Sequence, residues 1–158
     1  MSRSIPNFGA LLAPYIAQVP ESARPRFLAM LERGAAERYR MWAEALPQQA
    51  SGLLACAARE DEIADRIEQL FHIDEAMVLV LQAPLPAARD TYYAIFDGLD
   101  AFDQLAIQAD AERQGATAWR GIAAGISDPL IRVELEQCSL LEERSADFLD
   151  ALIVGSHP

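Results

Sequence analysis

The sequence predicts an all-α protein in which two repeated helical hairpins pack as a four-helix bundle. Hydrophobic residues make up 52% of the 158-residue chain, and Ala and Leu are abundant. Few stretches alternate strictly between apolar and polar residues, as a half-buried strand would. Apolar residues instead recur at every third or fourth position along four long segments, which is the spacing of a helix facing a core.

The first 21 residues predict an N-terminal arm. At most a short helix forms there, from Phe8 to Val19, because Pro14 interrupts it. Residues 22–158 are long enough to bury a core, and we expect them to form a single bundle domain.

The first hairpin is predicted from residue 22 onward. Its first helix starts near Ser22, a residue type suited to the N-cap, and ends at about Leu46. The short link Pro47–Gly52 leads into a second helix that ends near residues 71–72. A short link makes the two helices antiparallel neighbours.

The second hairpin follows a longer connection over residues 73–95, which holds the apolar run Met77–Leu81. We expect this connection to cross the length of the bundle. The third helix is predicted over about 96–126 and the fourth over about 130–154. A Ser-Asp-Pro turn at 127–129 separates them, with Ser or Asp as the cap and Pro at the first helical position.

The two halves of the chain align with each other. The first helices of the two hairpins match at an offset of 80 residues, and the second helices match at an offset of 82. The difference lies in the link between helices, where an insertion is best tolerated. The matched pairs include Glu32 with Glu112, Arg33 with Arg113, Tyr39 with Trp119, Cys56 with Cys138, Glu60 with Glu142 and Ile67 with Leu149.

Each of the four apolar stripes carries one carboxylate near its middle. A buried carboxylate is unfavourable unless it is paired, protonated or bound to a metal. Any one of them alone could lie at the edge of the core and reach water, but their equivalence in the repeat favours a converging cluster. The predicted metal ligands are Glu32, Glu60, Glu112 and Glu142.

This pattern resembles the ferritin-like di-iron carboxylate superfamily, rubrerythrin-type members especially. That family places a Glu on helices one and three and Glu-x-x-His on helices two and four. Glu32, with Tyr39 seven residues later, is similar to the first ligand position, and the other three glutamates match the remaining positions. The resemblance covers about 22–154 and implies a ferritin-like bundle with a long crossover.

Both histidines of that pattern are missing. Ile63 and Ser145 stand three residues after Glu60 and Glu142. His72, at a helix end, and His157, in the C-terminal tail, are poorly placed to replace them. The resemblance implies Fe or Mn as the bound ion, yet a set of carboxylates and waters favours hard cations such as Mn²⁺, Mg²⁺ or Ca²⁺. Oxygen activation by iron is therefore not expected.

Other residues near the glutamates have less specific interpretations. Cys56 and Cys138 face inward one turn before Glu60 and Glu142, and packing is expected of them rather than thiol chemistry. Gly115 could open space for a ligand or a close helix contact. Four arginines next to the glutamates point about 100° away on the helix, although a long side chain could fold back. They are Arg33, Arg59, Arg113 and Arg144.

Charge and composition exclude some partners. The net charge of −11 argues against nucleic acid and anionic membrane surfaces. No apolar run approaches the ~20 residues that span a bilayer. Two cysteines and no recognisable secretory signal predict a cytoplasmic protein. A bundle this apolar can also form a homodimer through an exposed helix face.

Two functions lead. The sequence narrowly favours a ferritin-like protein with an eroded di-iron site and no iron redox activity, acting as a binding or scaffolding module. The alternative is a metalloprotein that binds one or two ions through the four glutamates, with oxidoreductase-type activity. A third hypothesis, a pocket for a hydrophobic or acyl ligand, draws support from Ile63 and Gly115. The sequence does not decide whether the protein is an enzyme.

Overall fold

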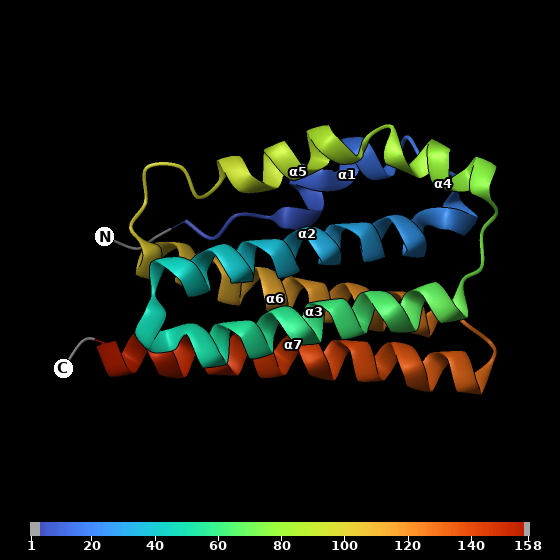
Figure 1. Ribbon diagram of the computed structural model, residues 1–158. Coiled ribbons are helices and arrows are strands. Elements are labelled where there is room, and N and C mark those ends of the chain that lie inside the picture. Colours follow the sequence, from blue (N-terminus) through green and yellow to red (C-terminus); the bar gives the residue numbers. More distant parts are fainter. Residues whose placement is uncertain (1–3, 157–158) are drawn as a thin grey trace. The chain divides into compact units, whose positions relative to one another are not determined.

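The computed structural model describes residues 4–156, and all regular secondary structure in that range is helical (Figure 1). The all-α prediction is confirmed. The chain forms two compact units, one spanning Gly9–Asp97 and the other comprising Gly98 onward with the residues up to Phe8. Each unit contains one long helical hairpin. None of the helices within 4–156 combines the length and apolar character needed to cross a bilayer.

The hairpin of the Gly9–Asp97 unit consists of α2 (Arg24–Ala45) and α3 (Ala50–Leu70), which contact each other extensively (Figure 1). The short 3₁₀ turn Pro47–Gln49 joins them, as the proline predicted. The predicted cap at Ser22 is wrong. A 3₁₀ turn, Glu21–Ala23, precedes α2, and Ala23 stands at the N-cap without a side-chain hydrogen bond.

The N-terminal segment contains α1 (Phe8–Ile16). The expected interruption at Pro14 is wrong, because the helix continues through this residue to Ile16. Pro6 and Phe8 belong to the unit that continues at Gly98, and they are held by Gln114 of that unit's first long helix. Its side-chain oxygen accepts from the Phe8 backbone N–H at 2.9 Å, and its Nε2 donates to the Pro6 carbonyl at 2.8 Å.

The connection 73–95 is helical over most of its length, which the sequence pattern did not predict. It forms α4 (Glu75–Gln82) and α5 (Leu85–Ala94). Asp74 caps α4 by accepting a hydrogen bond from the Met77 N–H at 2.8 Å. These helices share a buried apolar cluster with the start of α2 and the segment before it. The cluster consists of Val19, Ala23, Phe27, Leu81 and Ala88.

The hairpin of the other unit consists of α6 (Ala101–Ala124) and α7 (Pro129–Ser156). α6 begins about five residues later than predicted because Asp100 caps it, accepting from the Asp103 N–H at 2.8 Å. The predicted turn at 127–129 is confirmed. Asp128 accepts a hydrogen bond from the Leu130 N–H at 2.9 Å, and Pro129 is the first residue of α7.

Replacing Leu81 by Ala tests the packing of α4. Leu81 is fully buried in the cluster, whereas Leu79 on the same helix is 69% exposed. We expect Leu81→Ala to lower the free energy of unfolding by roughly 2–5 kcal/mol, through lost burial and a residual cavity. Leu79→Ala should change it by no more than about 0.5 kcal/mol. Urea denaturation measures both, and equal small effects would mean that α4 is not packed as described.

Candidate functional site

Two of the four predicted ligands lie close together in the α2–α3 hairpin. A carboxylate oxygen of Glu32, on α2, lies within 4.8 Å of one of Glu60, on α3. Glu60 is fully buried and Glu32 is half-buried. Like charges at this separation disfavour each other's ionised form. A cation or a proton shared by the two carboxylates would remove this repulsion.

The third predicted ligand, Glu142, lies on α7 against the backbone of α6. Its Oε1 accepts a hydrogen bond from the indole Nε1 of Trp119 at 3.1 Å. A Cβ added at Gly115 would stand only 2.6 Å from the same oxygen. Glu142 is buried. Its carboxylate is thus held against one particular stretch of α6.

The fourth predicted ligand, Glu112, is also buried, on α6. Its Oε1 accepts a hydrogen bond from the Nε2 of Gln108, one turn earlier, at 2.7 Å. Gln108 is itself buried. Sequence reasoning assigned no role to Gln108, although an amide on an apolar stripe four residues before a glutamate was the available signal.

The positions of the missing histidines are filled by side chains that do not supply imidazole. Ile63 and Ser145 are both fully buried. His72 follows the end of α3 and is exposed, while His157 lies outside the described residues. These residues do not fit the two-imidazole di-iron centre of the resembling family. The oxygen donors of Glu32 and Glu60, by contrast, fit a hard cation such as Mn²⁺, Mg²⁺ or Ca²⁺.

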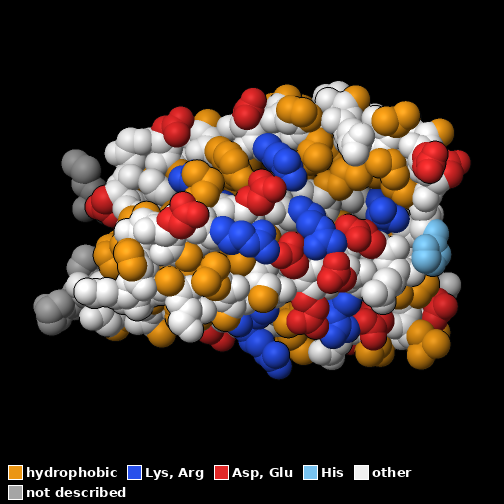
Figure 2. All heavy atoms as spheres, in the orientation of Figure 1, with side chains coloured by type: hydrophobic (Ala, Val, Ile, Leu, Met, Phe, Trp, Pro, Cys, Tyr) orange, Lys and Arg blue, Asp and Glu red, His pale blue; other side chains and the backbone are white. Residues whose placement is uncertain are grey.

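Arg33, next to Glu32 in sequence, engages acids on the outer face of α3. Figure 2 shows basic and acidic side chains gathered side by side in the middle of one face of the molecule. Arg33 lies 3.0 Å from Asp61, 2.6 Å from Asp65 and 3.1 Å from Glu68. Partial desolvation lowers the pKa of Arg33. The hydrogen bonds to Asp65 and Asp61 and the charge of Glu68 outweigh that effect, so its pKa lies above the usual value. The guanidinium points as the helical period predicted.

The ion pairs of the two hairpins repeat at the offsets that align their sequences. Each first helix carries two arginines that bind three acids of the second helix, at equivalent positions. The two hairpins therefore share one helix register, which makes their glutamates equivalent in three dimensions as well. The pairs are Arg33–Asp65 with Arg113–Asp147, Arg33–Glu68 with Arg113–Asp150, and Arg40–Asp61 with Arg120–Glu143.

The inward-facing cysteines are buried, as expected of packing residues. Cys56 and Cys138 occupy equivalent positions on α3 and α7. The Nη2 of Arg59 lies 3.2 Å from the Cys56 sulfur and donates to it. Arg59 is thus another arginine for which the structure gives a partner other than the glutamates.

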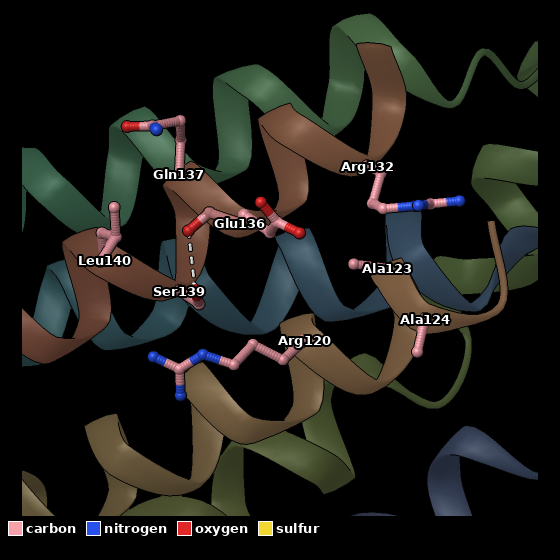
Figure 3. A pocket seen from close by; sticks show the side chains of 8 residues that line it. All are labelled: Arg120, Ala123, Ala124, Arg132, Glu136, Gln137, Ser139 and Leu140. Atoms are coloured by element: carbon pink, nitrogen blue, oxygen red, sulfur yellow. Dashed lines mark hydrogen bonds between the residues drawn. The ribbon is translucent and has the colours of Figure 1, made fainter. Parts of the chain in front are cut away.

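A surface groove of about 540 Å³ lies on the α6–α7 hairpin (Figure 3). Its two cations are already engaged, because Arg120 pairs with Glu143 and Arg132 donates to the Ile126 carbonyl at 3.0 Å. None of the four glutamates lines this groove. Its lining consists of Arg120, Ala123, Ala124, Arg132, Glu136, Gln137, Ser139 and Leu140.

Comparison with models of protein families, with curated proteins and with solved structures finds no match.

Removing Arg33 tests the outer ion-pair network. Arg33→Gln leaves three neighbouring acids without their shared cation, and we expect the free energy of unfolding to fall by about 1 kcal/mol at low salt. The matched variant is Arg113→Gln, whose arginine is more exposed and should contribute less. Both losses should shrink in 1 M NaCl because salt screens exposed charges. Equal, salt-independent losses would contradict the electrostatic origin.

Proposed function

We propose that this protein is a ferritin-like helical protein that binds a hard divalent cation through the buried glutamates of its two hairpins. The proximity of Glu32 and Glu60 carries the proposal. Their carboxylate oxygens lie within 4.8 Å, and Glu60 is fully buried. A cation held by both carboxylates offsets their mutual repulsion and the cost of burying their charge.

The donor chemistry selects the class of ion. Carboxylate oxygens completed by water suit Mn²⁺, Mg²⁺ or Ca²⁺ better than they suit the iron sites of the resembling family. Ile63 and Ser145 occupy the places where that family supplies nitrogen. A bound divalent ion would supply positive charge that polarises a coordinated oxygen. The chain itself supplies the carboxylates and the apolar surroundings that strengthen their attraction for a cation.

The ferritin-like assignment rests on the repeat. Each hairpin presents one glutamate on its first helix and one on its second, with the same register and the same outer ion pairs. Glu112 and Glu142 are buried like Glu60. The repeat thus gives each hairpin one pair of glutamates that can serve as cation ligands.

A metal-free binding or scaffolding module is the second candidate, favoured by an exposed apolar stripe on α7. Leu130, Val133 and Leu140 are 78%, 51% and 42% exposed and lie three and seven residues apart, on one helix face. The equivalent positions of the first hairpin are Gln48, Ser51 and Ala58. The first hairpin does not repeat this stripe, so α7 offers an apolar face for a partner, such as a second copy of the chain.

Metal binding separates the two candidates. Protein purified without chelator is expected to contain a divalent ion by elemental analysis, and added Mn²⁺ is expected to raise the melting temperature. An ion at 100 times its Kd stabilises the folded state by about 2.7 kcal/mol. For a chain of this size that corresponds to a shift of roughly 5–10 °C. No bound ion and no shift would rule out the metalloprotein and leave the scaffold.

Single glutamate substitutions test whether the two hairpins share one site. Glu60→Gln and Glu142→Gln should each weaken Mn²⁺ binding at least tenfold, about 1.4 kcal/mol. Isothermal titration gives the number of ions, and loss of all ions in either variant indicates a shared site, whereas loss of half indicates separate ones.

Glu136→Gln is the matched control because Glu136 is exposed on α7. It should leave Mn²⁺ binding unchanged. Without metal, Glu60→Gln is expected to keep or raise the melting temperature, because it relieves repulsion. Unchanged Mn²⁺ affinity in both buried-site variants would contradict the proposal.

A further inference from the structure

Gly115 lies in the interior of α6, where glycine is among the least favourable residues for a helix. Its backbone does not require glycine. Among the described residues, positive φ is found only at Gly98. Gly121 lies on the same helix, and a Cβ added there would meet nothing within 4 Å. Gly115 therefore differs from Gly121 in the side chain that packs against its backbone.

The carboxylate of Glu142 lies directly against Gly115. A Cβ at this position would stand 2.6 Å from Oε1, 2.9 Å from Cδ and 3.2 Å from Oε2. Real Cβ contacts are longer than the first two distances, so any other residue at 115 would displace the carboxylate. The whole carboxylate group, not one oxygen, depends on the absence of a side chain.

Trp119, one helical turn later, fixes the orientation of the same group. Its indole N–H donates to Glu142 Oε1 at 3.1 Å, and both residues are buried. An indole N–H donates only one hydrogen bond, while a carboxylate can accept about four. The Trp119 bond thus restricts the rotation of the carboxylate.

The first hairpin carries different residues at these two positions. The positions equivalent to Gly115 and Trp119 are Ala35 and Tyr39, both buried on α2. A methyl group at 35 occupies the space that Gly115 leaves open. In that hairpin a carboxylate oxygen of Glu60 lies within 4.8 Å of one of Glu32. The two hairpins match in their outer ion pairs but differ in the residues that face their second-helix glutamates.

We propose that Gly115 and Trp119 are positioning residues for Glu142 as a cation ligand. This inference rests on the proposed cation binding. Gly115 admits the carboxylate against α6, and Trp119 holds Oε1, so that Glu142 is oriented before the ion arrives. A ligand held in advance loses less freedom on binding, and the partners of ligands typically change metal affinity 10–100-fold.

Three variants on α6 test this role: Gly115→Ala, Trp119→Phe and Gly121→Ala. Gly115→Ala should weaken Mn²⁺ binding at least tenfold while its melting temperature without metal stays the same or rises. The melting temperature should not fall, because the substitution displaces only the carboxylate end of the flexible Glu142 side chain. Alanine is also more favourable than glycine inside a helix. Gly121→Ala, the matched control, should gain helix stability with unchanged Mn²⁺ affinity. Trp119→Phe keeps an aromatic ring, removes the donor and should also weaken binding about tenfold.

Tryptophan fluorescence supplies a second readout. The difference between the emission spectra of the wild type and of Trp119→Phe gives the emission of Trp119. Mn²⁺ should quench this emission in the wild type. Gly115→Ala should shift that emission even without metal, because the indole loses its hydrogen bond to Glu142.

Wild-type Mn²⁺ affinity in both Gly115→Ala and Trp119→Phe would overturn the positioning role and leave the proposed function standing. A wild type that binds no Mn²⁺ would overturn the proposed function and, with it, the positioning role. Should Gly115→Ala fail to fold, Trp119→Phe decides the question by the same affinity measurement.

Discussion

The burial of carboxylates within helical hairpins is the constraint on which the rest of this structure depends. Glu60, Glu112 and Glu142 occupy core positions where an apolar side chain would pack without an electrostatic cost. The chain accommodates them with specific neighbours. Gln108 donates to Glu112, Trp119 donates to Glu142, and Glu32 stands close to Glu60. Replacing buried ionic groups by apolar ones is often stabilising, so these neighbours offset a cost that an apolar core would not have.

The two hairpins agree on their outer faces and differ within. The arginine–acid pairs recur at the offsets of the sequence alignment, which fixes the same register of facing helices in both. The inner positions diverge, with Ala35 against Gly115 and Ile63 against Ser145. Exposed ion pairs contribute little stability singly. The ion pairs can nonetheless set the register of the facing helices. The inner residues are what differs between the two hairpins.

The elements that sequence reasoning missed are those stabilised by packing between segments. α4 and α5 are short and separated by Pro84, and isolated helices of this length are marginal in water. They are held by burial of Leu81 and Ala88 with Phe27 of α2. The sequence pattern also predicted the wrong start for α2. Ser22 has the chemistry of a cap, but the 3₁₀ turn Glu21–Ala23 places Ala23 at the cap position.

The sequence by itself determined the helical class, the two hairpins and the places of the four glutamates, because helical period is a local property of the chain. It also determined that imidazole is missing three residues after Glu60 and Glu142. Only the tertiary structure decided that Glu142 lies against Gly115 under the Trp119 indole. Such contacts depend on side-chain rotamers and on how closely two helices approach, and neither quantity is encoded in the spacing of residues along one helix.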